Sequence, residues 1–195
     1  MFWLRRVEPK ILLNEKKSMK RFILTGTPGS GKTMILRRLE SEGFGVVEEA
    51  ATDVISLEQA QGWAEPWKDP SFIDKVAELQ KLRQVRASHL PDNVQFHDRS
   101  VVCTVALARY LGYSLSAKAH HELERIRAEQ IFQPRVFFVQ NLGFMTASDA
   151  RRISFEEALH FERIHEETYH EYGFEIVSIG PGSVAERVAA IKALV

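Results

Sequence analysis

The sequence predicts an α/β domain in which a five-stranded parallel sheet lies between layers of helices. Five short apolar stretches alternate with segments of helical spacing along the 195 residues. The stretches are near-continuous, as is typical of parallel strands that are buried on both faces. Strands that alternate with helices along a chain predict this layered arrangement. The predicted strands are Arg21–Thr25, Phe44–Val47, Val94–His97, Val136–Gln140 and Phe174–Ile179.

Helix-start signals lie between these strands. Capping-box spacing, a serine followed three residues later by Glu or Gln, begins at Ser56, Ser154 and Ser183. Apolar residues three or four apart predict the buried side of two late helices. For the helix from about Ser154 these are Ala158, Phe161, Ile164, Thr168 and Tyr172, and for the last helix Val184, Val188 and Ile191.

The composition excludes several classes of protein. Hydrophobic residues make up 45% of the chain, which indicates a globular protein. The 26 basic residues balance 26 acidic ones, so nothing favours non-specific binding to nucleic acid or a membrane surface. The chain has one cysteine, Cys103, which excludes a disulfide framework or a cysteine-rich zinc site and fits a reducing cytoplasm. Cys103 is expected to be a packed thiol. The seven histidines show no metal-binding spacing and are expected to be structural or on the surface.

Residues 26–33 carry the most specific functional signal. They form a complete G-x-x-x-x-G-K-[ST] phosphate-binding loop between a strand and a helix, in the order Gly26, Thr27, Pro28, Gly29, Ser30, Gly31, Lys32 and Thr33, with Met34 next. The glycines let backbone N–H groups face inward, where they and the positive end of the helix cradle phosphates. Lys32 is expected to reach the β- and γ-phosphates, and the Thr33 hydroxyl to hold Mg²⁺. The chain is therefore expected to bind ATP with Mg²⁺ in a P-loop NTPase fold.

Residues 19–195 are expected to form one domain. Residues 1–18 differ in character and form an N-terminal extension, which either precedes a natural start at Met19 or forms an extra strand or arm. Two segments interrupt the strand–helix alternation, and long insertions in compact domains are often functional. We expect residues 51–91 to lie on the acceptor side of the nucleotide and residues 141–153 to form a lid.

The third predicted strand ends in Asp98 and Arg99, at the sheet edge where such folds bind ligands. Asp98 is expected beside the γ-phosphate, where it would accept a proton from a substrate hydroxyl or help to hold the metal. Arg99 is expected to contact phosphate or substrate. The alternative for Asp98 is a strand-end acid that caps the next helix.

Arg151 and Arg152 lie in the predicted lid. Two arginines on a closing loop suit stabilisation of charge on the phosphates during transfer. The alternative is a solvated basic loop.

Glu49 follows the second strand and is expected to face the acceptor. A favourable interaction of its charge with the positive end of the next helix explains a glutamate at this position nearly as well. Arg86, on a helix of the 51–91 insertion, is a second acceptor-binding candidate, with solvation as the alternative. Trp63 and Trp67 are expected to be local core rather than stacking partners of a substrate. Three more polar residues of that helix could line the same pocket: Gln80, Arg83 and Gln84.

These motifs resemble those of the small P-loop kinases, and more closely those of the AAA-like ATP-binding domain family allied to ribosylnicotinamide kinase. The likeness extends over roughly residues 19–195 and implies a nucleoside- or nucleotide-kinase-like fold with strand order 2-3-1-4-5. It also implies that Asp98 is the catalytic carboxylate and that Arg99 acts at the phosphates. The segments that carry it are 26–33, 47–51, 98–104, 108–112 and 155–172.

Three positions depart from that family's usual pattern. Ser100 stands where glycine is frequent, Cys103 where a second aspartate is common, and Thr52 where an arginine often follows the two alanines. The sequence Asp-Arg-Ser is instead similar to that of the deoxynucleoside kinases. The identity of the acceptor is therefore not carried over.

The function expected from the sequence is a cytoplasmic kinase that transfers the γ-phosphoryl group of ATP to a small-molecule or nucleotide-like acceptor. The alternative is an ATPase switch or regulatory module that acts through a protein partner. The sequence contains no N-K-x-D segment after a predicted strand, which argues against a GTPase. No predicted strand ends in the Asp-Glu pair of hexameric motors, which argues against such a motor. No apolar run approaches the roughly 20 residues of a membrane span, and no nucleic-acid partner is expected.

Overall fold

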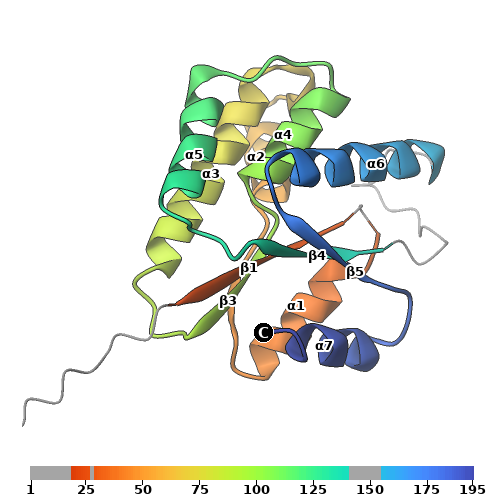
Figure 1. Ribbon diagram of the computed structural model, residues 1–195. Helices are drawn as coiled ribbons and strands as arrows, with labels where there is room; N and C mark the ends of the chain where they lie inside the picture. Colours follow the sequence, from red (N-terminus) through yellow and green to blue (C-terminus); the bar gives the residue numbers. More distant parts are fainter. Residues whose placement is uncertain (1–18, 27–28, 141–154) are drawn as a thin grey trace, which may run out of the picture.

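The computed structural model describes residues 19–26, 29–140 and 155–195. Its centre is a parallel sheet with the strand order β2-β3-β1-β4-β5 (Figure 1), which confirms the predicted fold class. Each predicted strand overlaps an observed one, and no strand end differs by more than one residue. The strands are β1 (Lys20–Thr25), β2 (Gly45–Val47), β3 (Val94–Asp98), β4 (Arg135–Val139) and β5 (Glu175–Ile179).

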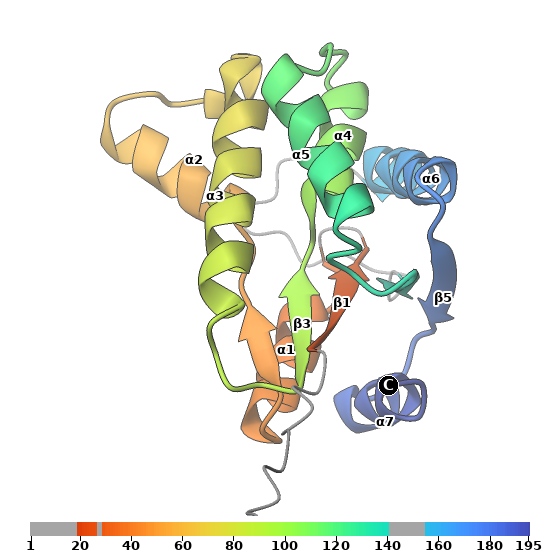
Figure 2. The same ribbon diagram turned by 60° about the vertical axis from the view of Figure 1, so that its left-hand side comes forward.

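Helices cover both faces of the sheet (Figures 1 and 2). Helices α1 and α7 pack together on one face, whereas α3, α4, α5 and α6 cover the other and α2 packs beside α3. The helix bounds are α1 (Lys32–Ser41), α2 (Ala51–Ala60), α3 (Ser71–Ala87), α4 (Val101–Tyr110), α5 (Ala117–Ala128), α6 (Phe155–Glu171) and α7 (Val184–Lys192), and a short 3₁₀ turn, η1, spans Pro66–Lys68.

The hydrophobic core has a layer on each side of the sheet. Phe22, Phe96 and Phe137 meet in the layer under α1 and α7, with ring centroids 5.6–6.3 Å apart. Ile23 belongs to the opposite layer, under α4 and α6, because successive side chains of a strand point to opposite faces. The same alternation applies at the end of β3, and it separates the side chains of two neighbouring residues, His97 and Asp98.

The predicted helix starts have three outcomes. Ser183 caps α7 with the predicted capping box, which Glu186 completes. The prediction at Ser56 is wrong, because α2 already begins at Ala51 and the Ser56 hydroxyl donates a hydrogen bond to the Thr52 carbonyl within the helix (2.9 Å). Ser154 lies outside the described residues. No serine caps α2 at its start, so spacing alone misplaced this helix by one turn or more.

The predicted buried stripe of α6 is mostly right. Ala158, Phe161 and Thr168 are buried, whereas Ile164 and Tyr172 are half-buried. Two further residues of this helix, His165 and Tyr169, are completely buried although the pattern did not single them out.

The two insertion tryptophans differ. Trp67 packs against a hydrophobic cluster formed by α2, α3 and α4, as predicted. Trp63 is 58% exposed, so the prediction that it belongs to a local core is wrong. It follows α2 in the turn before η1, where no other element covers it within the part of the chain that the structure describes.

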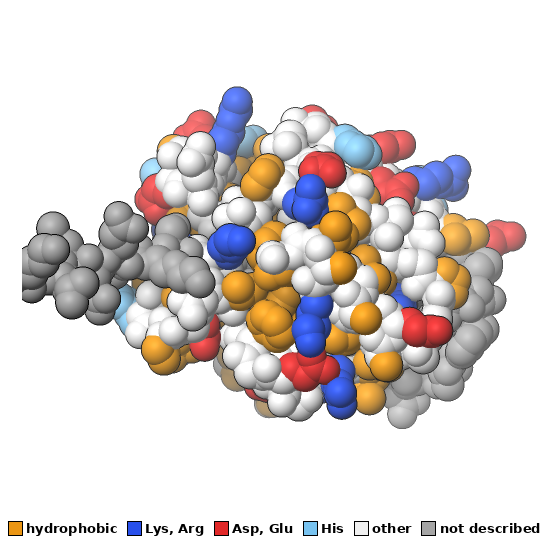
Figure 3. Space-filling model, turned by 60° about the horizontal axis from the view of Figure 1, so that its bottom comes forward, with side chains coloured by type: hydrophobic (Ala, Val, Ile, Leu, Met, Phe, Trp, Pro, Cys, Tyr) orange, Lys and Arg blue, Asp and Glu red, His pale blue; other side chains and the backbone are white. Residues whose placement is uncertain are grey.

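The surface agrees with the neutral composition on the side that Figure 3 shows, where acidic and basic side chains are interspersed and neither sign gathers into a large patch. Within the described residues, no helix is both long enough and apolar enough to cross a membrane.

Candidate active site

The phosphate-binding loop connects β1 to α1 at the carboxyl edge of the sheet. Gly31, at the start of α1, has a φ of 86°, a left-handed conformation that glycine adopts without strain. Gly26 is also left-handed, and a Cβ atom there would overlap the carbonyl oxygen of Val139 on β4. Glycine is therefore required at both positions. Thr27 and Pro28 lie outside the described residues.

Lys32 is folded back onto the loop. Its Nζ donates hydrogen bonds to the Gly26 carbonyl (2.9 Å) and to the Ser30 hydroxyl (3.4 Å), and the side chain is buried. Burial and the charge of Arg99 lower the pKa of Lys32 to about 8, although nearby carboxylates oppose this. A phosphate would relieve the cost of this burial, because it supplies an opposite charge.

Thr33 and Met34, by contrast, are exposed in the first turn of α1, and Met34 is 60% exposed. The first backbone N–H groups of a helix have no acceptor within the helix and carry the positive end of its dipole. This turn therefore presents hydroxyl and amide groups to solvent at the point where a phosphate would bind.

Asp98 ends β3 and lies beside Leu24 of β1 in the sheet register. Its Oδ1 atom is buried and has no hydrogen-bond partner among the described residues. Burial raises the pKa of Asp98, and the charge of Glu49 adds to the increase, whereas Lys32 opposes it. The alternative of a helix cap is wrong, because the Ser100 hydroxyl caps α4 by accepting a hydrogen bond from the Val102 amide.

A carboxylate oxygen without a partner, together with the exposed Thr33 hydroxyl, fits a hard cation that prefers oxygen ligands, such as Mg²⁺. Among the described residues, no three His, Cys, Asp or Glu side chains cluster as a metal site. Any magnesium would therefore take most of its ligands from the nucleotide and water, as is usual for this ion.

Arg99 has an unusual backbone and a well-anchored side chain. Its φ of 71° is left-handed, and its amide donates a hydrogen bond to the Leu24 carbonyl (3.0 Å). Its guanidinium forms an ion pair with Glu49 (Nε to Oε1, 2.7 Å) and contacts Nε2 of His165 (3.4 Å). Burial opposes the charge of Arg99, but its neighbours Glu49, Cys103 and Asp98 together outweigh burial and raise the pKa of Arg99. Strained backbone that the surroundings hold in place is typical of functional sites.

Glu49 is the other half of this ion pair. Its second oxygen accepts a hydrogen bond from the Thr52 hydroxyl (2.9 Å). Burial raises the pKa of Glu49, but the charges of Arg99 and Lys32, together with the hydrogen bonds from Thr52 and Arg99, outweigh burial, so the pKa lies below the ordinary value. Glu49 is therefore an ionised carboxylate at the same sheet edge as Asp98.

His165 was expected, like the other histidines, to be structural or on the surface, and its contact with Arg99 was not predicted. It lies on α6, and its Nδ1 donates to the Phe161 carbonyl (2.9 Å), so its Nε2 is free of a proton and accepts from Arg99. Burial and the charge of Arg99 lower the pKa of His165 to about 3, which keeps the ring neutral. The available signal was its place between Phe161 and Thr168 on the buried stripe of the helix.

Arg187 was also missed. It is 4% exposed, and its guanidinium donates to the Ser30 carbonyl of the phosphate loop (2.8 Å) and to the Gln140 carbonyl after β4 (3.2 Å). Burial lowers the pKa of Arg187. A signal existed here as well, because Arg187 lies next to Val188 and four residues before Ile191, on the apolar face of α7.

A buried polar cluster lies behind the loop. The Tyr169 hydroxyl contacts the Ser100 hydroxyl (3.1 Å) and the Cys103 thiol (3.0 Å), and that thiol also contacts the Thr25 hydroxyl (3.0 Å). Cys103 is free and buried, which confirms the prediction of a packed thiol. The cluster ties α4 and α6 to the end of β1, where the loop begins.

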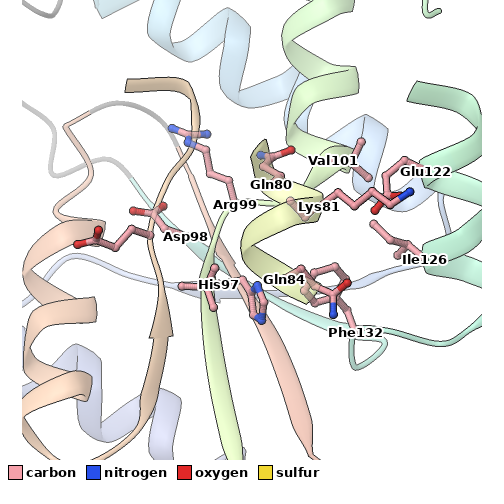
Figure 4. Close-up of a pocket in the computed structure, with 13 residues that line it drawn as sticks. Gln80, Lys81, Gln84, His97, Asp98, Arg99, Val101, Glu122, Ile126 and Phe132 are labelled. Atoms are coloured by element: carbon pink, nitrogen blue, oxygen red, sulfur yellow. The ribbon is translucent and has the colours of Figure 1, made fainter. Parts of the chain in front are cut away.

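The acceptor-side candidates are divided by the structure. Gln80 and Gln84 line a pocket that also includes Asp98 and Arg99 (Figure 4). Arg83 instead holds the backbone carbonyls of Glu48 and Glu49 and pairs with Asp53. Arg86 is exposed on α3 and is not among the residues that line this pocket. Arg151, Arg152 and the predicted lid lie outside the described residues.

Comparisons with known proteins agree with this architecture. The model of a family described as an AAA domain matches residues 21–187. The structure of NadR in complex with NR has a TM-score of 0.68 and 19% identity, and the match covers 90% of this chain and 50% of that one. The structure of NadR in complex with NAD and AMP-PNP has a TM-score of 0.63 and 20% identity, and the match covers 90% of this chain and 48% of that one. This chain therefore spans about half the length of the NadR chains.

A second group of similar structures has nearly the same length as this chain. Deoxyadenosine kinase from M. mycoides, with the products dCMP and a flexible dCDP bound, has a TM-score of 0.59 and 13% identity, over 89% of this chain and 97% of that one. The comparison with curated proteins finds no significant match. The structural likeness, at these identities, concerns the fold.

Proposed function

Because this chain belongs to the AAA-domain family whose model spans residues 21–187, we propose that it is an ATP-dependent phosphotransferase. It transfers the γ-phosphoryl group of ATP to a small-molecule or nucleotide-like acceptor. The observation that carries this proposal is the convergence of Lys32, Asp98 and the Arg99–Glu49 pair at one sheet edge, with a pocket leading away from them. Site and pocket together favour transfer to a second substrate.

The nucleotide is held by the phosphate loop. Lys32 exchanges its contacts with Gly26 and Ser30 for the β- and γ-phosphates, and backbone N–H groups of the loop, other than Pro28, which has none, surround the phosphate tail. Thr33 and Asp98 would hold Mg²⁺, which when bound neutralises charge on the phosphates. Thr27, Pro28 and Met34 complete the proposed nucleotide site.

Asp98 acts on the acceptor. Burial raises its pKa, which suits a group that takes a proton, and the carboxylate oxygen that does not help to hold Mg²⁺ is the one that would take it. The acceptor oxygen forms a bond to the γ-phosphorus while the bond to the bridging oxygen of ADP breaks, and the proton of the acceptor moves to Asp98. Positioning and charge stabilisation supply most of the rate in such reactions.

Glu49 and Arg99 position the acceptor. The ion pair fixes both side chains, and the 29% exposure of the Glu49 side chain leaves part of it accessible to a ligand. Arg99 adds positive charge beside the phosphates. We assign to Arg151 and Arg152, in the predicted lid, the role of adding positive charge beside the phosphates. We assign Arg86 to the outer rim of the acceptor side.

The titles of the similar structures support the choice of acceptor. NadR is described with NR, NAD and AMP-PNP, and deoxyadenosine kinase with deoxynucleotides. We propose an acceptor of this general kind, a small molecule whose hydroxyl group would lie beside Asp98.

The experiment is a metabolite screen with ATP and magnesium, read by mass spectrometry for a mass gain of one phosphoryl group. A product that forms only with the intact chain, and not with Lys32→Ala, supports the kinase. Acceptor-independent release of phosphate, with a stable protein partner recovered by pull-down, would support the ATPase switch instead. Absence of nucleotide binding would contradict both.

A further inference from the structure

Helix α6 contacts the end of β3 through two side chains that lie one turn apart. His165 and Tyr169 are four residues apart, so they share one face of the helix, and both are completely buried. The His165 ring meets the guanidinium of Arg99 (Nε2 to Nη1, 3.4 Å). The Tyr169 hydroxyl meets the hydroxyl of Ser100, the next residue of the chain (3.1 Å). One face of α6 therefore holds both the side chain of Arg99 and the residue that follows it.

The hydrogen bonds of His165 determine which ring nitrogen faces Arg99. Its Nδ1 donates to the Phe161 carbonyl within the helix (2.9 Å), which leaves a lone pair on Nε2. A guanidinium has only donors, so Arg99 donates and Nε2 accepts. The Phe161 ring packs edge-on against the imidazole, with centroids 4.1 Å apart, and restricts its rotation. The acceptor atom is therefore presented to Arg99 in one orientation.

The two groups that hold the Arg99 guanidinium differ in charge. Glu49 supplies a carboxylate (2.7 Å), whereas His165 is a neutral acceptor, because burial and the charge of Arg99 lower its pKa to about 3. When all four are ionised, Lys32 and Arg99 balance Glu49 and Asp98, which lie close enough to influence one another. A carboxylate in place of His165 would make this group negative and repel the anionic phosphates of a nucleotide. A neutral acceptor orients the guanidinium without that cost.

The place of Arg99 explains why its orientation matters. Its charge adds to burial in lowering the pKa of Lys32, so the two cations are neighbours. Since Lys32 is proposed to reach the β- and γ-phosphates, Arg99 lies near the same end of the nucleotide. In Figure 4, its side chain extends away from His97 and Gln84. An arginine side chain is long and flexible, and fixing it before the ligand arrives reduces the entropy lost on binding.

We propose that His165 is a positioning residue that holds the Arg99 guanidinium in place for the γ-phosphate of the bound nucleotide. Tyr169 assists by fixing Ser100 and so the end of β3. His165 acts only through Arg99 and does not touch either substrate. This inference rests on the proposed function, in which Arg99 adds positive charge beside the phosphates, and it adds a residue of α6 to that site.

The test measures how much the γ-phosphate contributes to binding. Calorimetry with the full chain and magnesium gives the affinities for AMP-PNP and for ADP, which lacks the third phosphate. His165→Phe keeps a ring of similar shape but removes both nitrogens. It should weaken AMP-PNP binding about fivefold, the effect of one lost hydrogen bond, and leave ADP affinity within twofold. His165→Gln, whose terminal oxygen can accept from Arg99, should restore AMP-PNP affinity to within twofold of the unchanged chain.

A double-mutant cycle shows whether the effect passes through Arg99. Arg99→Met should weaken AMP-PNP binding about tenfold by itself, and the addition of His165→Phe should change the affinity by less than twofold more. A general loss of packing would instead add its full effect to that of Arg99→Met. The matched control is His170→Phe, since His170 is exposed on the same helix, and it should change neither affinity.

If His165→Phe does not fold, Tyr169→Phe provides the second variant. It removes only the hydroxyl that meets Ser100 and Cys103, and it should weaken AMP-PNP binding about threefold with ADP affinity within twofold. Four results would overturn the inference: equal losses of AMP-PNP and ADP affinity, unchanged AMP-PNP affinity in the folded variants, no recovery in His165→Gln, or additive losses in the double variant. Failure of the unchanged chain to bind AMP-PNP would instead contradict the proposed function itself.

Discussion

The two sides of the end of β3 differ in how they are built. On the proposed nucleotide side, the groups that we expect to touch a phosphate come mainly from the one contiguous loop between β1 and α1 and the first turn of α1. The pocket that we propose for the acceptor is lined by side chains from four separate segments, among them His97, Gln80, Glu122 and Phe132. Phosphates are the same in every nucleotide, so a fixed backbone motif suffices for them. Acceptors differ, and a pocket assembled from separated side chains can change without disturbing the loop.

Lys32→Ala should break the nucleotide side most completely. Removal of the ammonium group is expected to lower ATP affinity by roughly 10² or more, because charge-assisted hydrogen bonds to phosphate are strong. The folded structure should not suffer, since burial already lowers the pKa of Lys32 to about 8 and its charge is costly there. Calorimetry and a thermal melt measure the two effects. Unchanged ATP affinity would refute the assignment of the loop.

Asp98→Asn tests whether the two sides meet at this residue. Nucleotide affinity should change only a few-fold, while turnover with the identified acceptor falls by roughly 10² or more. Glu175→Gln is the control, because it alters an exposed carboxylate at the far end of the sheet. Full turnover in Asp98→Asn would show that Asp98 is not the proton acceptor.

Arg187→Met tests whether the loop also depends on a residue far away in the sequence. The Ser30 and Gln140 carbonyls lose their donor, so ATP affinity should fall about tenfold and stability by about 1–3 kcal/mol. Urea unfolding and calorimetry provide the measurements.

Lys192→Met is the matched control for Arg187→Met on the same helix. Its ion pair with Glu42 is exposed and worth about 0–1 kcal/mol, and it does not touch the loop. An equal loss of ATP affinity in both variants would remove the case for a specific contact.

The smallest expected effect is a proton taken up with the nucleotide. The pKa of Lys32 is about 8 in the free protein and rises when phosphates surround it, so binding at pH 8 should take up about half a proton. Below the free-state pKa the lysine is already charged and uptake vanishes. Above it the protein must first bind a proton, so ATP affinity should decline as the pH rises from 8 toward 10. Calorimetry in two buffers of different ionisation enthalpy measures the uptake, and none at pH 8 would contradict this account.

The sequence was sufficient for the strands and for the position of the loop between β1 and α1, because their signals are local. The phosphate loop and the five strands depend on residues that are close together in the chain, and the strands matched within one residue. The Ser56 cap failed because a spacing motif does not show that a helix has already begun upstream. Trp63 failed because aromatic character does not show which element covers a residue.

The contacts that Arg99, His165 and Arg187 make could not be predicted from the sequence, for a different reason. Arg99 was singled out, but its contacts with Glu49 and His165 span 50 and 66 residues. The first depends on the pairing of β2 with β3, and the second on the packing of α6 against α4. His165 and Arg187 sit on apolar helix faces, where sequence patterns direct attention to their hydrophobic neighbours. Polar residues on such faces are the signal that a future sequence analysis should use.

The contact between Arg187 and Ser30 joins positions 157 residues apart, and this has a consequence for biosynthesis. At about 5–20 residues per second, a ribosome needs on the order of 10–30 s to reach α7 after it has made the loop. During that interval the nascent chain contains the complete loop but not the hydrogen bond from Arg187 to the Ser30 carbonyl. We therefore expect newly made protein to acquire full affinity for ATP only when translation has released α7 from the exit tunnel.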